Sequence, residues 1–590
     1  MDKLIHEKLD RFNRKLVLDK KGISFEGNYT PSIELNVEDT MYNTFLNTVE
    51  KNPNAMCITD WIKDKRYTRK EVLDMIDDFA GALYLDGVRQ GDIIALPVKN
   101  SVEAFVALIA ANKIGAITKW IDIEKSACEI SDSFKESDVK YVIAEKLIED
   151  KINKIDDINR DKLLIIDSEN DSKNSEFNKF LNRGKNVNID PIKYDKNMPA
   201  LIISSSGSTG KPKNMLHSSF SVNSAVKKLL YTDYPITNNL VTVSVPPYIG
   251  LGLVTSFYSS IICEGEALIL PEYKNPGCFA SFLLKDYTKI RDMIGDRKIL
   301  LFGAPVFYKV LASELDKLPS LDFIGGMVAA GNKMTKEELT ALDSAYKLKG
   351  CNVPICNAYG QNEHCGGVTY NMINDNKQGS AGKIAYATRV MIVDPETKEQ
   401  LPLNETGKVL EQSDSQFIGY YKNPEAEEKC KFIDSDGEEW FDTGDLGSID
   451  EDHFLHIFDR ESRSIIRFDF KIALASVENK LLRSSKVKDA LVVRVNVDTP
   501  MGKDQAPFAF VTLKDNCDVT SEDILNEIQS GDYPLSIFEN PVAIEIIKEN
   551  QIPYNNNKVH YPTLENVAQQ LIDNAENTNN IDNQKKKVKE

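Results

Sequence analysis

The chain has 590 residues, of which 42% are hydrophobic and 27% are charged, and its formal net charge at pH 7 is −18. This length exceeds one ordinary hydrophobic core, so we expect a globular protein with two or more domains. The negative charge argues against a general nucleic-acid binder, which needs a basic face. The chain contains no run of about 18 apolar residues, so we predict no membrane span.

The start of the chain and its cysteines bear on where the protein works. Residues 1–8 are charged and contain no apolar core of a signal peptide. The nine cysteines show no paired spacing, which is typical of reduced thiols, so we expect a cytoplasmic protein. Cys351, Cys356, His364 and Cys365 are close in sequence, but their spacing fits no standard zinc pattern and favours buried thiols over a metal site.

The first elements alternate between helix and strand. We expect residues 1–38 to be a lead-in segment with little structure, and apolar residues at helical spacing begin after Thr40. Thr68 is a candidate cap for a helix from Arg69 to about Leu85, and Ser101 for one over 102–114. Short apolar segments that read as strands lie between such helices: Cys57–Trp61, Asp92–Val98, Gly115–Thr118, Tyr141–Ala144 and Leu163–Asp167. This alternation predicts an α/β fold with a largely parallel sheet.

The remainder of the chain repeats this pattern and then changes. Polar residues 168–198 predict a surface connection, and a second α/β alternation runs from Leu201 to about Val393. Short strands and turns over 379–420 predict a β-rich subdomain. We therefore expect a large N-terminal lobe over 39–458 with two α/β sheet units, a small α+β lobe over 459–573, and a disordered tail over 574–590.

A Ser/Gly loop between Leu201 and Lys213 is the first candidate site. The apolar run 200–203 predicts a strand that leads into small and hydroxyl residues and two lysines: Ser204, Ser205, Ser206, Gly207, Ser208, Thr209, Gly210, Lys211 and Lys213. Converging backbone N–H groups, hydroxyls and lysines are suited to phosphate oxygens. The loop is not a Walker A motif, because Ser205 and Pro212 stand where that motif needs Gly and Ser or Thr. A flexible turn is the alternative.

Four short motifs with charged or aromatic residues follow in chain order. They are Asn357–Glu363 (Asn-Ala-Tyr-Gly-Gln-Asn-Glu), Trp440–Gly447 (Trp-Phe-Asp-Thr-Gly-Asp-Leu-Gly), Phe458–Ser462 (Phe-Asp-Arg-Glu-Ser) and Pro553–Val559 (Pro-Tyr-Asn-Asn-Asn-Lys-Val). Each one alone fits an ordinary turn or surface loop.

Together with the Ser/Gly loop, these motifs resemble those of the adenylate-forming superfamily, in the same order. That superfamily contains acyl-CoA synthetases, adenylation domains of peptide synthetases and luciferases. The resemblance runs from about Thr40 to about Leu564, nearly the whole chain. It implies an AMP-forming acid–thiol ligase, whose small C-terminal lobe is mobile and carries a catalytic lysine.

The resemblance also implies roles for particular residues. Ser205, Ser206, Gly207, Ser208, Thr209, Gly210, Lys211 and Lys213 would hold the phosphates of ATP, with Tyr359, Gly360 and Asn362 near the adenine. Glu363 would bind Mg²⁺ at the α-phosphate, because a hard cation prefers carboxylate oxygen. Asp445 and Arg460 would contact the ribose, Lys471 would lie near the phosphate, and Lys558 would bridge the α-phosphate and the carboxylate.

Three functions remain open at this point. The first is an acyl-CoA synthetase that uses ATP, Mg²⁺ and coenzyme A. The second is a stand-alone adenylation protein that loads a separate carrier protein. The third is a non-catalytic relative that binds nucleotide or acyl ligand, which is favoured by departures from the family pattern at Asn214, Asp459, Ser462, Asp469 and Asn557.

One position predicts the class of acid. In amino-acid adenylation domains, an aspartate follows the aromatic residue of the segment that matches Pro246–Gly250 and pairs with the α-ammonium of the substrate. Ile249 stands at that position here. An ammonium buried against isoleucine would lack a counter-charge, so we expect an acid without an α-amino group.

Overall fold

The structure is a computed structural model, and it describes residues 6–9, 14–19, 22–27, 31, 33–205, 213–270, 276–331, 334, 336–395, 397–434, 436–460, 464–468, 470–500, 502–514, 517, 519–555 and 558–587. The chain divides into two compact units. Unit 1 contains Met1–Ser205 and Lys213–Glu461, and Ser462–Glu590 belongs to unit 2. Each unit has its own hydrophobic core.

A seven-stranded sheet forms the first layer of unit 1, and its strand order is β21-β11-β10-β7-β6-β8-β9. The strands from β10 to β9 in this order are parallel, and β11 and β21 add an antiparallel edge. Their bounds are β6 Ile93–Leu96, β7 Ile117–Trp120, β8 Val139–Glu145, β9 Leu163–Ile166, β10 Pro199–Ser205, β11 Lys213–Ser218 and β21 Gly419–Tyr420.

A nine-stranded sheet forms the second layer, with the order β18-β17-β16-β15-β14-β12-β13-β4-β5. Its six central strands are parallel, which is the pattern expected from helical crossovers. Their bounds are β4 Met56–Asp60, β5 Lys65–Thr68, β12 Leu240–Val243, β13 Glu266–Ile269, β14 Ile299–Gly303, β15 Ile324–Ala329, β16 Ile355–Gln361, β17 Gly366–Tyr370 and β18 Lys383–Ile384.

The third sheet of unit 1 is antiparallel and confirms the predicted β-rich part. Its order is β1-β2-β3-β19-β20-β23-β22, and β24 also pairs with β23. The strands are β1 His6–Leu9, β2 Arg14–Asp19, β3 Gly22–Gly27, β19 Thr388–Val393, β20 Gly407–Ser413, β22 Lys431–Ile433, β23 Glu439–Ile449 and β24 Leu455–Arg460. The first three strands correct the expectation that 1–38 is a lead-in with little structure. Arg389 pairs with Ser24, so this segment extends the sheet.

Capping residues fix the helix starts that the sequence predicts. Thr68 accepts from the Glu71 amide and Glu71 accepts from the Thr68 amide, a capping box at the start of α2 Arg69–Leu85. Ser101 caps α3 Val102–Ile114 by accepting from the Ala104 amide. The other helices of unit 1 are α1 Met41–Lys51, α4 Ala127–Glu136, α5 Glu149–Asn153, α6 Glu176–Gly184, α7 Ser219–Leu230, α8 Ser259–Ile262, α9 Cys278–Ile294, α10 Pro305–Ser313, α11 Lys336–Leu348 and α12 Pro424–Lys429.

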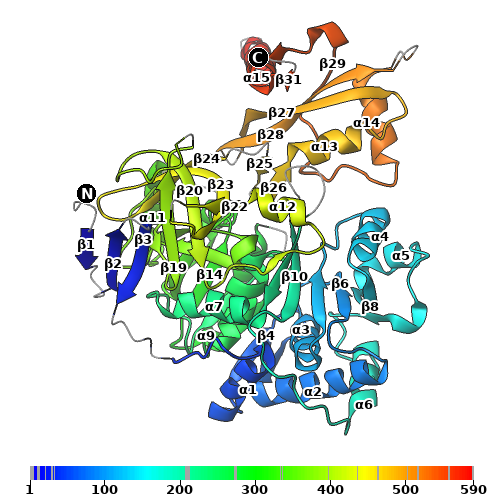
Figure 1. Ribbon diagram of the computed structural model, residues 1–590, viewed down its shortest axis with the longest axis vertical. Coiled ribbons are helices and arrows are strands. Elements are labelled where there is room, and N and C mark those ends of the chain that lie inside the picture. Colours follow the sequence, from blue (N-terminus) through cyan, green and yellow to red (C-terminus); the bar gives the residue numbers. More distant parts are fainter. Residues whose placement is uncertain are drawn as a thin grey trace. The chain divides into compact units, whose positions relative to one another are not determined.

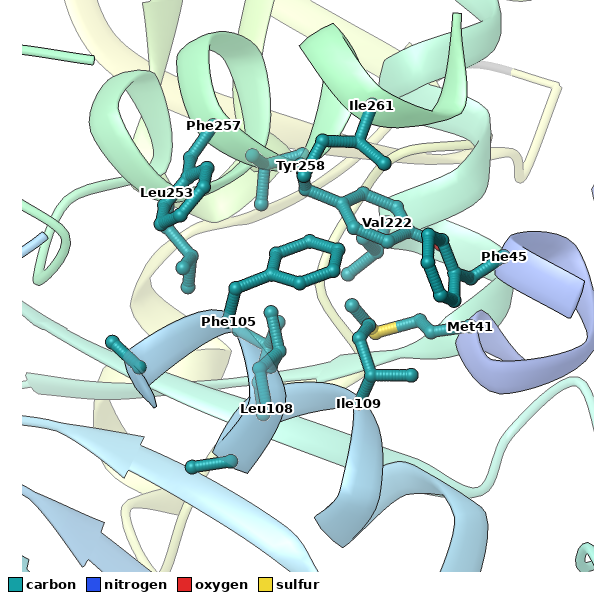
Figure 2. Close-up of a cluster of buried hydrophobic side chains, with 14 of the residues drawn as sticks. Met41, Phe45, Phe105, Leu108, Ile109, Val222, Leu253, Phe257, Tyr258 and Ile261 are labelled. Carbon is teal, nitrogen blue, oxygen red and sulfur yellow. The ribbon is translucent and has the colours of Figure 1, made fainter. Parts of the chain in front are cut away.

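One hydrophobic cluster joins the two α/β sheets of unit 1. It contains residues of β6, β7 and β10 from one sheet and of β4, β12 and β13 from the other, with the helices that cover them. Figure 2 shows its centre, where Phe105 of α3 lies among side chains of α1, α7 and a π-helical segment over Leu251–Tyr258. The Phe105 ring centroid lies 5.7 Å from that of Phe45 and 5.4 Å from that of Phe257. This packing joins the elements that precede and follow the Ser/Gly loop in one core.

Unit 2 is a smaller α+β unit (Figure 1). Its strands are β25 Ser464–Arg467, β26 Phe470–Ala473, β27 Val487–Thr499, β28 Gly502–Leu513, β29 Ile544–Ile546, β30 Tyr554–Asn555 and β31 Lys558–Val559. Its helices are α13 Leu474–Leu481, α14 Ser521–Gln529 and α15 Tyr561–Lys587. Helix α15 corrects the expected disordered tail from 574, because the chain is helical as far as Lys587. Across the described residues, no helix has the length and apolarity that a membrane crossing requires.

Candidate active site

The Ser/Gly loop joins two antiparallel strands. Ser205 at the end of β10 pairs with Lys213 at the start of β11, so both ends of the loop are fixed by one ladder. Ser206, Gly207, Ser208, Thr209, Gly210 and Lys211 lie outside the described residues, as does the side chain of Ser205. The ammonium of Lys213 lies 5.1 Å from the centroid of the Tyr420 ring, on the neighbouring strand β21.

The motif Asn357–Glu363 begins in strand β16 and ends in a single 3₁₀ turn, η5, over Asn362–His364. The close pairing of β16 with β17 requires a glycine at 360, because a Cβ there would lie 1.9 Å from the carbonyl oxygen of Gly366. Tyr359 and Gln361 are two residues apart in the strand and therefore face the same side.

Those two side chains converge on Asp445 of β23, which is 1% exposed. The Tyr359 hydroxyl donates to Asp445 Oδ2 at 2.6 Å, and Gln361 Nε2 donates to the same oxygen at 3.0 Å. Gln361 Nε2 also donates to the Thr443 carbonyl at 3.0 Å. The structure thus brings together Tyr359 and Asp445, which the sequence assigns to one nucleotide site. It adds Gln361, which the sequence analysis missed although period-2 alternation with Tyr359 pointed to it.

Asn362 and Glu363 are held by two other elements. Asn362 Oδ1 accepts from the Gly250 amide at 2.9 Å, which fixes the start of the segment 250–258. Glu363 Oε1 accepts from the Tyr420 hydroxyl at 2.9 Å, and its carbonyl accepts from the Phe417 amide at 2.7 Å. Burial, and then the neighbouring Glu363 carboxylate, raise the pKa of Tyr420 well above its ordinary value. Tyr420 therefore stays protonated and donates to Glu363; no predicted motif contains it.

Glu363 is half-buried, and its carboxylate raises the question of whether the residues around it could bind a metal ion. Among the described residues, no three His, Cys, Asp or Glu side chains are grouped so that they could hold an ion. A single carboxylate nevertheless fits Mg²⁺, which keeps several waters and binds through one or two carboxylates together with substrate phosphates. The Glu363 carboxylate therefore offers one oxygen ligand of the kind that Mg²⁺ binds.

Behind Glu363 lies a set of buried polar residues, of which the sequence predicted only the burial of Cys365. His217, His364, Cys365 and Glu411 are each 0% exposed and Lys228 is 1% exposed. Cys365 Sγ lies 3.0 Å from His217 Nδ1, so Cys365 contacts a histidine of β11 rather than the cysteines near it in sequence. Burial, reinforced by the Asp445 charge, raises the pKa of Glu411 to about 8, and burial lowers the pKa of Lys228 to about 7.

The other predicted site residues lie where their side chains are not described. The backbone of Arg460 in β24 pairs with that of Asp445, so the two residues are neighbours across a ladder. Lys471 lies in β26 and Lys558 opens β31, both in unit 2. The side chains of all three lie outside the described residues.

Comparisons with known proteins agree with the architecture. A family model described as AMP-binding enzyme matches residues 45–421. 4-coumarate–CoA ligase 4 of Arabidopsis thaliana is 23% identical over 83% of this chain and 85% of its own length. Probable 4-coumarate–CoA ligase 1 of Dictyostelium discoideum is 26% identical over 87% and 92%.

Solved structures with the same fold include a double mutant of o-succinylbenzoate CoA synthetase from Bacillus subtilis. That structure is 20% identical to this chain, with a TM-score of 0.72, and covers 89% of this chain and 98% of its own. At this identity the likeness concerns the fold, and it confirms the predicted α/β architecture.

Proposed function

The chain belongs to the family of AMP-binding enzymes, and from this premise we propose that it is an acyl-CoA synthetase. As an AMP-forming acid–thiol ligase, it would join a carboxylic acid to ATP, release pyrophosphate, and pass the acyl group to the thiol of coenzyme A. Relatives named as 4-coumarate–CoA ligases that align over most of their length support this reaction class.

The observation that carries the proposal is the convergence of Tyr359, Gln361 and Asp445 beside the Glu363 turn. Asp445 is a buried carboxylate that already accepts two hydrogen bonds, so its position is fixed before a ligand arrives. Carboxylate oxygens of this kind accept the two hydroxyls of a ribose. Glu363, four residues beyond Tyr359 along the chain, would hold Mg²⁺ against the nucleotide phosphates. An ion there would offset the negative charge that accumulates when a carboxylate approaches ATP.

The remaining roles assign the protein's own groups to the reaction. Lys213 and the loop before it would hold the outer phosphates, and Arg460 would add a contact to the ribose. Lys558 would neutralise charge where the acid attacks the α-phosphorus, and Lys471 would lie near the phosphate. Both lysines lie in unit 2, which we propose is the mobile lobe. Rotation of that lobe would let the same site serve adenylation and then thiol transfer.

The experiment that tests the function is a carboxylic-acid panel scored by pyrophosphate release, with and without coenzyme A. An acyl-CoA synthetase will release pyrophosphate with one class of acid and form a thioester only when coenzyme A is present. Release without thioester formation would favour the alternative in which a separate carrier protein is loaded. The absence of release with every acid, while ATP still binds, would favour a non-catalytic binding protein.

The same panel addresses the acid itself. Ile249 carries no charge and directly precedes Gly250, whose amide is held by Asn362. We propose that a fatty, aryl or other acid without an α-amino group is the substrate. Amino-acid-dependent turnover above that of every amine-free acid would refute this.

A further inference from the structure

A buried polar layer lies beneath the turn that carries Glu363, and the proposed reaction assigns it no task. The layer consists of His217, Lys228, His364, Cys365 and Glu411, which come from β11, α7, the Glu363 turn and β20, all within unit 1. Polar side chains with almost no exposed surface are uncommon in a protein interior unless they are bonded or have a task.

Two members of the layer are held firmly. The ammonium of Lys228 donates to Ser413 Oγ and Ser415 Oγ, each at 2.7 Å, and so connects α7 to the end of β20 and to the segment that follows it. Cys365 contacts His217 of β11, the strand that follows the Ser/Gly loop. Strand β11 and helix α7, which follow that loop in the chain, therefore pack behind the Glu363 turn.

His364 and Glu411 are less well satisfied. His364 Nδ1 lies 3.4 Å from Glu411 Oε2, and both side chains are fully buried. Within the part of the chain that the structure describes, neither carboxylate oxygen of Glu411 and neither ring nitrogen of His364 has a hydrogen-bond partner. Leaving such groups unbonded in an apolar interior costs free energy, so an apolar pair would be the cheaper choice for packing alone.

The position of this pair connects it to Glu363. His364 directly follows Glu363, and its ring meets Phe441 edge to face, with 5.2 Å between ring centroids. The Phe441 centroid is 5.9 Å from that of Phe417, whose amide donates to the Glu363 carbonyl. Any movement of the His364 ring would therefore displace the turn, and with it the carboxylate of Glu363, the residue before His364.

The charges around Glu411 come from each element packed against it. Lys228 of α7, Glu363 of the turn and Asp445 of β23 are the titratable groups within electrostatic range of it. Burial disfavours the charged form of Glu411, so its contribution to the turn is the contact with His364 and not a charge.

From this geometry we propose that Glu411 is a positioning residue for Glu363. Its contact with His364 fixes the turn, so that the Glu363 carboxylate is in place when a hard divalent cation arrives with nucleotide phosphates. The proposal rests on the proposed function for the identity of that cation. Groups that orient a metal ligand by contact typically change metal affinity by about 10- to 100-fold. Glu411 acts through a neighbouring residue, so we expect the lower end of that range.

The test compares two substitutions of similar size. Glu411→Leu removes the polar contact with His364, whereas Glu411→Gln keeps a polar group there. Binding of Mn²⁺, a paramagnetic substitute for Mg²⁺, is measured by electron paramagnetic resonance in the presence of α,β-methylene-ATP, which is not cleaved. We expect Mn²⁺ affinity to fall about tenfold in Glu411→Leu and to stay within about twofold of wild type in Glu411→Gln.

Glu145 provides a matched control. It is also a buried glutamate, 2% exposed, with one oxygen unbonded among the described residues, but it lies on β8, away from the Glu363 turn. Burial raises the pKa of Glu145 to about 7, so its electrostatic situation is similar to that of Glu411. We expect Glu145→Leu, which loses only the hydrogen bonds from Ser168, to leave Mn²⁺ affinity unchanged.

Two results would overturn the positioning role of Glu411: wild-type Mn²⁺ affinity in Glu411→Leu, or an equal loss of affinity in Glu145→Leu. If Glu411→Leu does not fold, His364→Leu breaks the same contact from the other side and must show the same loss. Because metal and nucleotide binding are measured without turnover, these results stand even if the wild type releases no pyrophosphate with any acid. The absence of pyrophosphate release from the wild type would refute only the proposed function.

Discussion

The Glu363 turn in unit 1 and the Lys558 hairpin in unit 2 carry the two charged groups to which we assign roles in adenylation, and they are built differently. Four consecutive side chains, from Gln361 at the end of β16 to His364 of the turn, contact four other elements. Gln361 bonds to Asp445, Asn362 to Gly250 and Glu363 to Tyr420, and His364 approaches Glu411. The position of each group is therefore set by the tertiary structure before any ligand binds.

The Lys558 hairpin consists of two strands of two residues each. Tyr554 pairs with Val559 and Asn555 with Lys558, while Ile552 and Val559 on its flanks join a hydrophobic cluster of unit 2. The hairpin is thus attached through its base. By the proposed function, nucleotide recognition would belong to a preorganised unit, and the group that acts on the reacting atoms would belong to the other unit. Binding and chemistry should then be separable by mutation.

Lys558→Ala is the variant expected to have the largest effect. Lys558 would contribute mainly in the transition state, where charge at the α-phosphate shifts, so the loss should appear in rate. Removing one such donor typically costs about 100- to 1,000-fold in rate. The rate of pyrophosphate release measures this loss. ATP affinity is measured alongside, and we expect it to be unchanged.

An exposed lysine of the same unit serves as the control for that variant. Lys548→Ala removes an equal charge at the start of a short 3₁₀ turn over 549–551 and should retain the wild-type rate. Pyrophosphate release within a few-fold of wild type in Lys558→Ala would remove Lys558 from the mechanism and break the contrast between the two regions.

Asp445→Ala tests the other side of the comparison. It removes the acceptor of two hydrogen bonds from Tyr359 and Gln361 and, by the proposed function, of two ribose hydroxyls. Hydrogen bonds to charged groups contribute about 1.5–3 kcal/mol, so ATP affinity should fall about 10- to 100-fold. Asp442→Ala on the same strand, which loses an ion pair with Lys408, should bind ATP like wild type. Equal affinities for all three proteins would exclude Asp445 from the nucleotide site.

The local features of this fold could be predicted from the sequence, and the distant pairings could not. Thr68 and Ser101 mark helix starts because a cap bonds within three residues. The strands before residue 30 pair with one another locally, but they join the rest of the sheet only through β3 and β19, whose paired residues Ser24 and Arg389 are far apart in sequence. Helix α6 was assigned to a surface connection because polar residues surround Phe177, Phe180 and Leu181, the three large apolar side chains that it buries.

The candidate site shows the same division. Tyr359, Glu363 and Asp445 stand out because short motifs surround them, and their roles remain predictions. Glu411 and Lys228 carried no signal, since an isolated charged residue in a strand or helix reads as a solvated face. Only the tertiary structure reveals that both are buried behind Glu363.

Asp469→Gly asks whether unit 2 has a second task. Asp469 lies outside the described residues and follows β25 in the chain. The resemblance to the adenylate-forming superfamily implies a glycine at this position. An aspartate there would place a negative charge near an arriving thiol and disfavour its thiolate.

The two half-reactions of that variant should respond differently. We expect thioester formation with coenzyme A to rise about tenfold, as one pKa unit of thiolate stabilisation would give, and pyrophosphate release to be unchanged. If wild-type transfer is already as fast as adenylation and the glycine variant leaves it unaltered, Asp469 has no part in the step.

Tyr420→Phe should have the smallest effect, and it tests how far preorganisation of the turn depends on one bond. The hydroxyl of Tyr420 donates to Glu363 Oε1 at 2.9 Å, and its ring lies near the Lys213 ammonium. Phenylalanine keeps the ring and loses the donor. Because Glu363 is only half-buried, water can replace the lost hydrogen bond, so the magnesium concentration for half-maximal pyrophosphate release should rise about three- to fivefold.

Tyr421→Phe is the neighbouring control, since Tyr421 is bonded through its backbone to the Asn214 carbonyl and this bond is kept. It should retain the wild-type magnesium dependence. The remaining contacts of the Glu363 turn, through Gln361, Asn362 and His364, are untouched in Tyr420→Phe. They explain why the expected effect is small. If Tyr420→Phe lost as much pyrophosphate release as Lys558→Ala, the hydrogen bond from the Tyr420 hydroxyl alone would hold Glu363 in place. The turn would then be no more preorganised than the hairpin of unit 2.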